Sequence, residues 1–206
     1  METIINSPLV EFGIANFVLP GEGTSGDCHV LRCRPGGLLV AAIDGIGHGE
    51  EAAGAAKTAA SILSNGADEP IISLVEECHR ALRSTRGVVL SVASIDLTHG
   101  MMTWLGVGNV VGALARVVPR GSNFPEMLLL RGGVVGKQLP ALQAQVLPVS
   151  EGDTLFFSTD GVKGHYVETV SARENPQRAA DRILQKFHTA NDDALVLAVR
   201  LTGIHK

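Results

Sequence analysis

The order of strand-like and helix-like segments is the feature that most constrains the fold of this chain. Patterns of apolar residues predict strands, then two adjacent helices, then a series of strands, then one helix and a last strand, at residues 9–20, 29–44, 50–64, 68–82, 88–161, 176–188 and 192–201. A parallel sheet needs a crossover, usually a helix, between successive strands, and this regular alternation is absent. The order instead favours an α+β fold, with antiparallel sheets in layers and helices outside them.

Two local patterns make specific predictions within this order. Residues 88–118 alternate well enough to predict two long strands joined by a turn at 98–100. Before the second helix, Asp68 is the expected N-cap, and Pro70 is expected in the first helical turn.

Length and composition limit the class of protein. The 206 residues are enough for one domain with a sizeable core, so we expect a single domain over 1–206. The net charge of −4 argues against nucleic acid as a partner. The first residues lack the basic region of a signal peptide, and no stretch approaches the ~18 apolar residues that a membrane helix requires. With three cysteines, an odd number, the sequence predicts a cytoplasmic protein without a disulfide framework.

Carboxylates recur at the boundaries of apolar strands. Asp44 follows "LLVAAI", Asp160 follows "LFFST", Asp192 and Asp193 precede "ALVLAV", and Asp27 precedes another strand. Strand ends can converge at one rim of packed sheets, where several carboxylates repel one another unless cations neutralise them. Mg²⁺ and Mn²⁺ prefer such oxygen ligands, and two such ions can activate water for hydrolysis. The alternative for each Asp-Gly pair alone is an ordinary turn.

Four segments in this order, "AAIDGIGHGEEA", "GVGNV", "LFFSTDGV" and "NDDALVLAV", resemble the metal-dependent Ser/Thr protein phosphatases (PPM, or type 2C). The chain is most similar to the compact bacterial branch of that family that includes SpoIIE. The resemblance extends from about Asp27 to Leu201. It implies an α-β-β-α sandwich of two antiparallel sheets flanked by helices, in agreement with the element order.

The same resemblance implies the site residues. Catalysis would depend on Asp44, Asp160 and Asp192, and metal contacts would come from Asp44, Gly45, Asp160, Asp192, Asp27 and Asp193. Asp44 resembles the carboxylate that bridges two metal ions, and Gly45 the residue that offers a backbone carbonyl. Asp27 resembles an acidic position that contacts metal through water. Asp192 aligns with the metal ligand of the last motif, and Asp193 aligns with the residue after it. A shift of this alignment by one residue would make Asp193 the ligand instead.

Some positions depart from the pattern of the family. Many members carry His two residues after the bridging carboxylate, where it can act as a general acid, but this chain has Ile46. His48 fits a bacterial variant of the motif, and it either donates a proton or only caps the following helix. The segment with Gly106, Gly108 and Asn109 matches a glycine-rich segment with a structural role. The phosphate-binding arginine of larger relatives has no evident match.

The resemblance implies a Mn²⁺- or Mg²⁺-dependent phosphatase with two ions and no phosphoenzyme. The implied substrates are phosphoserine or phosphothreonine in stressosome-type regulatory proteins, the STAS-domain scaffold and switch proteins, so that the enzyme resets a bacterial stress-signalling pathway. The first alternative is a pseudophosphatase that binds phosphoproteins on the same fold. A nucleotide-binding loop at 45–49 fits less well, because its third glycine is misplaced and Asp44 would repel a phosphate. We expect a monomer.

Overall fold

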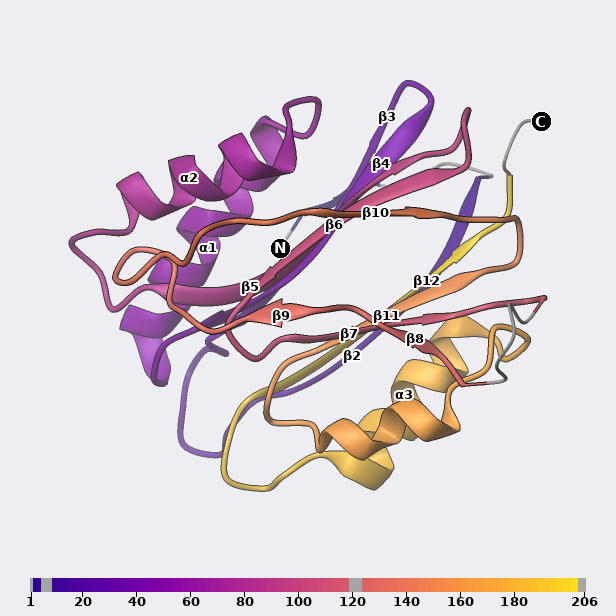
Figure 1. Ribbon diagram of the computed structural model, residues 1–206. Coiled ribbons are helices and arrows are strands. Elements are labelled where there is room, and N and C mark those ends of the chain that lie inside the picture. Colours follow the sequence, from indigo (N-terminus) through magenta and orange to yellow (C-terminus); the bar gives the residue numbers. More distant parts are fainter. Residues whose placement is uncertain (1, 5–8, 119–123, 204–206) are drawn as a thin grey trace.

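Two β-sheets packed face to face form the centre of the protein. The computed structural model describes residues 2–4, 9–118 and 124–203 (Figure 1). The seven-stranded sheet contains, in spatial order, β1 (Glu2–Ile4), β3 (Asp27–Arg34), β4 (Gly37–Gly45), β5 (Val88–Asp96), β6 (Met101–Val107) and β10 (Gln145–Pro148), with β9 (Leu130–Arg131) also beside β6. The five-stranded sheet contains β2 (Val10–Phe17), β12 (Ala194–Leu201), β11 (Thr154–Ser158), β7 (Val111–Ala115) and β8 (Glu126–Met127). Among the described strands, only the β1–β3 and β6–β9 pairs are parallel.

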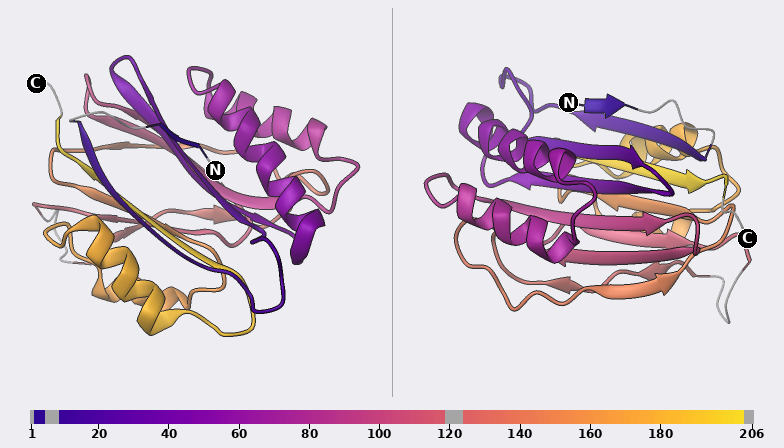
Figure 2. Two further views of the ribbon diagram at one scale, coloured as in Figure 1. Left: turned by 180° about the vertical axis from the view of Figure 1, so that it is seen from behind. Right: turned by 90° about the horizontal axis from the view of Figure 1, so that it is seen from above.

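Helices cover the outer face of each sheet. The seven-stranded sheet carries α1 (Gly49–Asn65) and α2 (Ile71–Ala81), and the five-stranded sheet carries α3 (Pro176–Phe187) and the 3₁₀ helix η1 (Gly164–Thr169) (Figure 2). One apolar core lies between the sheets and one lies under each helical layer. The predicted α+β sandwich is therefore confirmed. Across the residues that the structure describes, we find no helix with the length and apolar character needed to cross a bilayer.

Strand β4 shows why a run of apolar residues forms the centre of the larger sheet. Side chains alternate between the two faces of a strand. Leu38 and Val40 pack into the core between the sheets, whereas Leu39 and Ile43 pack under α1 and α2. Because both faces of β4 are covered, the strand is apolar without alternation until it reaches Asp44.

The long second strand predicted within residues 88–118 is wrong, because the chain leaves the sheet after Val107. Gly108 has a φ of +96°, a conformation that favours glycine, and the next strand, β7, belongs to the opposite sheet. A Cβ at Gly108 would also overlap the side chain of Val89. This crossing places residues 108 and 109 at the rim where the two sheets meet the pocket described below.

The predicted start of the second helix is also wrong by two residues. Pro70 occupies the N-cap position, no side chain caps this end, and α2 begins at Ile71. Since proline lacks a backbone N–H, it suits the boundary of the helix better than its interior. The predicted helix itself is confirmed, because α2 lies within 68–82 and buries the apolar residues Leu74, Val75 and Cys78 against the sheet.

Candidate active site

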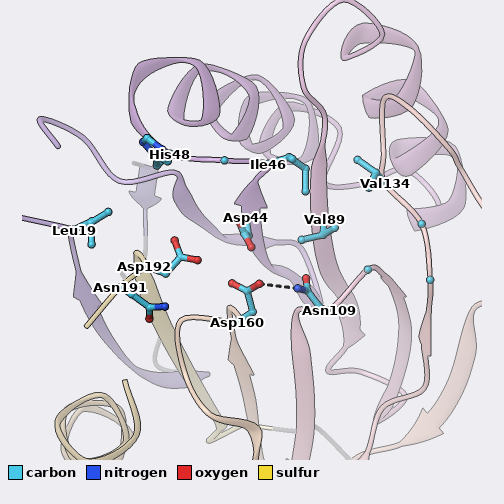
Figure 3. Close-up of a pocket in the computed structure, with 14 residues that line it drawn as sticks. Leu19, Asp44, Ile46, His48, Val89, Asn109, Val134, Asp160, Asn191 and Asp192 are labelled. Carbon is cyan, nitrogen blue, oxygen red and sulfur yellow. Dashed lines mark hydrogen bonds between the residues drawn. The ribbon is translucent and has the colours of Figure 1, made fainter. Parts of the chain in front are cut away.

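Three aspartates from distant parts of the sequence line one pocket. Asp44 lies near the end of β4, Asp160 lies in the turn after β11, and Asp192 lies just before β12. Figure 3 shows their carboxylates pointing toward one another in a pocket of about 580 Å³. The predicted convergence of strand ends is therefore observed for these three residues. Asp44 belongs to β4, and Asp160 and Asp192 each lie within two residues of the paired strands β11 and β12, so the sheets anchor all three.

A fourth carboxylate, that of Asp27, lies behind the pocket. Asp27 is the cross-strand partner of Asp44 in the β3–β4 ladder. Its Oδ2 accepts a hydrogen bond of 2.7 Å from the hydroxyl of Thr159, which in turn accepts one from the backbone N–H of Leu195. Asp27 is not among the residues that line the pocket. A water-mediated role agrees with this position better than direct contact with an ion in the pocket.

The carboxylates destabilise each other's charged forms. Burial, followed by the charges of Asp27, Asp160 and Asp192, raises the pKa of Asp44 to about 9. Burial also raises the pKa of Asp27 to about 7, although its hydrogen bond from Thr159 partly opposes the shift. Without cations, these groups therefore retain protons near neutral pH.

Hard divalent cations fit this donor set. The pocket offers carboxylate oxygens, which Mg²⁺ and Mn²⁺ prefer. Bound ions would offset both the burial and the mutual repulsion that raise the pKa values of Asp44 and Asp27. Within the described part of the chain, no three acidic, His or Cys side chains already surround a common metal position. The aspartates thus line one pocket, but in this arrangement they do not surround a single metal position.

Asn109 holds one of the three aspartates in place. Its Nδ2 donates a hydrogen bond of 2.8 Å to Oδ2 of Asp160, and Asn109 itself lines the pocket (Figure 3). From the sequence we expected only a structural role for the segment with Gly106, Gly108 and Asn109. Its position directly after the Gly108 turn was the available signal that Asn109 reaches the site.

Asp193 has a different task from its neighbour. Its two carboxylate oxygens accept hydrogen bonds from the backbone N–H groups of Leu19, at 2.8 Å, and Gly26, at 2.6 Å. Asp193 is buried and does not line the pocket, whereas the half-buried Asp192 does. The carboxylate of Asp193 is thus used to fix the loop that leads into β3. The ligand role implied for this pair is therefore proposed below for Asp192 alone.

We expect Asp193→Ala to lower the free energy of unfolding of the metal-free protein by about 3 kcal/mol, because it leaves two backbone donors without their acceptor. The adjacent change Asp192→Ala is the matched control, with an expected loss below about 1 kcal/mol. Urea denaturation in EDTA measures both. A larger loss for Asp192→Ala would reverse the assignment of the two residues.

The glycines beside the aspartates permit close packing of backbones. A Cβ at Gly45 would overlap the backbone of Ala52 in α1, and a Cβ at Gly161 would overlap the carbonyl oxygen of Asp193. Neither glycine lines the pocket. These contacts bring α1 and the loop before β12 close to the site. Close packing of the backbone therefore accounts for glycine at both positions, and no contact with a ligand is needed to explain them. A metal contact by the carbonyl of Gly45 stays a prediction.

His48 lines the pocket and is oriented by an acidic partner. Its Nδ1 lies 2.6 Å from Oε1 of Glu22, and the side chain makes no capping bond although His48 occupies the N-cap position of α1. Among the described residues, no hydrogen bond to its other ring nitrogen, Nε2, is found. The capping alternative is therefore wrong for the side chain. Ile46, at the position where many family members carry His, also lines the pocket but has no proton to donate.

Comparisons with known proteins agree with this architecture. The sequence pattern of the family Stage II sporulation protein E (SpoIIE) matches residues 34–202, which include Asp44, Asp160 and Asp192. Phosphoserine phosphatase RsbX of Bacillus subtilis (strain 168) is 27% identical over 161 residues, which cover 73% of this chain and 79% of RsbX.

Solved structures match over nearly the whole chain. A chain from a study of the bacterial stressosome as a modular system is 27% identical, with a TM-score of 0.85 over 93% of this chain and 99% of that one. RsbX in complex with magnesium is 19% identical, with a TM-score of 0.86 over 98% and 100% of the two chains. The catalytic domain of the phosphatase PstP with two manganese ions is 13% identical, with a TM-score of 0.70 over 94% and 99%.

The metals in the last two structures are those that the sequence predicts for this site. The match to the SpoIIE family covers most of the chain, including Asp44, Asp160 and Asp192. The fold of this chain is the fold of the RsbX structure. The chain therefore belongs to the SpoIIE family and is a phosphatase with the PP2C type of fold.

Proposed function

We propose that this protein is a Mn²⁺- or Mg²⁺-dependent phosphatase, acting as one domain, that removes phosphate from serine or threonine in regulatory proteins of the stressosome type. The convergence of Asp44, Asp160 and Asp192 in one pocket is the observation that carries this proposal. The similarity to RsbX and to the stressosome-related chain supports the substrate class, STAS-domain scaffold or switch proteins.

The residues of the chain have separate tasks in this proposal. Asp44, Asp160 and Asp192 would hold two divalent ions, because their carboxylates line one pocket. When bound, the ions would supply a more acidic water as nucleophile and neutralise the charge of the phosphate. Asn109 keeps the Asp160 carboxylate oriented, and Thr159 does the same for Asp27.

The test is release of phosphate from phosphorylated STAS-domain proteins with Mn²⁺, with Mg²⁺ and with EDTA. We expect turnover with either metal and loss of turnover in EDTA. Tight binding of the phosphoprotein without turnover under any metal condition would contradict the proposal and favour the pseudophosphatase alternative.

We further propose that His48 donates the proton to the departing serine or threonine oxygen. His48 lines the same pocket as the three aspartates, and its charge acts on Asp192. The carboxylate of Glu22 holds Nδ1, which leaves Nε2 as the atom that can donate. Glu22 is then a positioning residue, held beside the start of α1 because Gly49 has no side chain to exclude it.

The dependence on the leaving group tests this role. We expect His48→Gln to lower kcat about 100-fold on a phosphoserine peptide but less than about threefold on p-nitrophenyl phosphate, whose leaving group departs without protonation. Glu22→Gln should give a smaller loss with the same substrate preference. Equal losses on both substrates would show that His48 acts in binding or folding instead.

A further inference from the structure

Positive charge is concentrated in one part of this acidic protein. Residues 78–150 contain seven Lys and Arg but two Asp and Glu, whereas the rest of the chain contains ten Lys and Arg and 19 Asp and Glu. Much of this positive charge falls in two short stretches, which we call the first basic segment (79–86) and the second basic segment (131–137).

The two basic segments lie side by side although they are far apart in the sequence. Just beyond the first segment, Val88 exchanges two backbone hydrogen bonds with Val135 in the second, at 3.0 and 2.8 Å. The ammonium group of Lys137 donates a hydrogen bond of 3.3 Å to the backbone oxygen of Arg83. Figure 1 shows the corresponding loops together at the left, after α2 and after β9. Their charges therefore act as one surface.

This surface borders the active-site pocket. Residues 132–134 of the second segment line the pocket, and Figure 3 places Val134 on the side opposite Leu19. The guanidinium of Arg86 lies against Gly47, another lining residue, since a Cβ at Gly47 would come within 2.6 Å of its Nη1. A peptide that enters the pocket from this side would therefore pass over the basic segments.

The charges on the surface are available to a partner. Arg83 and Lys137 are exposed, and within the described part of the chain neither has a carboxylate within 4.0 Å. Arg86 pairs with Glu51 at 2.7 Å, but the two side chains are 52% and 71% exposed. Such exposed ion pairs stabilise little, so Arg86 can exchange this partner for another.

We propose that the basic surface formed by Arg83, Arg86 and Lys137 binds acidic residues that flank the phosphorylated residue of a protein substrate. This inference rests on the proposed phosphatase function. The carboxylates of the pocket repel an acidic peptide. The Arg and Lys side chains beside the pocket attract such a peptide over roughly the 8–10 Å Debye length at moderate salt. Complementary charges of this kind raise association rates and select partners more than they tighten binding.

Two phosphoserine peptides provide the test, one with glutamates around the phosphoserine and one with glutamines at the same positions. At low salt we expect the wild-type protein to hydrolyse the glutamate peptide with a roughly tenfold higher kcat/KM, and the difference to shrink in 0.5 M NaCl. The double variant Arg83→Glu/Lys137→Glu should lose or invert this preference and keep its activity on p-nitrophenyl phosphate.

The matched control is Arg173→Glu/Arg178→Glu, which makes the same change of charge at exposed positions beside and on α3. Its peptide preference should equal that of the wild-type protein. An equal loss of preference in both double variants would overturn the inference, because net charge alone would then explain it. A wild-type protein without preference would overturn it as well.

A binding measurement separates this inference from the proposed function. Fluorescence anisotropy with the unphosphorylated glutamate peptide should show binding that Arg83→Glu/Lys137→Glu weakens at least about fivefold and the control does not. If the peptide binds in this way but no substrate is hydrolysed, the phosphatase function fails while the surface stands. Selective binding of a DNA oligonucleotide in place of the peptide would overturn the assignment of the partner.

Discussion

Asp44→Asn is expected to lower phosphatase turnover by at least ~100-fold, since changes to residues that only support metal ligands already cost roughly 10–100-fold in metal affinity or activity. Asparagine keeps the shape of the side chain but removes the charge that would hold two cations together. The metal-free variant should nevertheless be more stable than the wild-type protein at about pH 8, because burial, followed by the charges of the neighbouring carboxylates, raises the pKa of Asp44 to about 9. Turnover, calorimetric Mn²⁺ binding and thermal unfolding in EDTA measure the three effects.

Asp68→Asn is the matched control, because Asp68 is exposed before α2 and takes no part in the pocket. The same chemical change there should leave turnover, Mn²⁺ binding and unfolding unaltered. Turnover like that of the wild-type protein in Asp44→Asn would refute the metal-site assignment. A lower unfolding temperature of this variant in EDTA would refute the electrostatic account of Asp44.

The stability of the metal-free protein is expected to fall as pH rises, and the stabilisation by Mg²⁺ or Mn²⁺ to grow. The pKa values of Asp27 and Asp44 are raised to about 7 and about 9, above the value of ~3.9 for an unfolded aspartate. For a carboxyl group with a raised pKa, the contribution to stability is fully present below the unfolded pKa and is lost as pH rises through the folded pKa. Cations bind the ionised groups, so their binding releases protons and strengthens over the same range.

Melting temperatures in EDTA and in excess Mg²⁺, between about pH 5.5 and about pH 8.5, check this expectation. The EDTA curve should decline, and the difference between the two conditions should widen with pH. Asp44→Asn provides the internal comparison, since it lacks the group with the higher pKa and should show a flatter decline in EDTA. If the difference in melting temperature between EDTA and excess Mg²⁺ did not depend on pH, the raised pKa values assigned to Asp27 and Asp44 would be contradicted.

The sequence by itself determined the layered arrangement of sheets and helices and the identity of the three aspartates of the site. The uninterrupted apolar run of β4 indicated a strand covered on both faces, and Asp44 at its end indicated a polar rim, because these features depend on local periodicity. Asp160 and Asp192 were identified in the same way, from their places beside apolar strands. The break after Val107 was missed, because the alternation was followed through Gly108, although a glycine within a strand pattern can mark such a break.

Only the tertiary structure decided which way the side chains in the loops point. Asp192 and Asp193 are adjacent and chemically identical, and Asp193 turns away from the pocket because backbone donors 174 and 167 residues distant, those of Leu19 and Gly26, capture its oxygens. The pairing of Glu22 with His48 likewise joins two loops. Side chains in irregular loops have no period to fix their direction, so contacts between distant segments determine it, and those contacts exist only once the two sheets have packed.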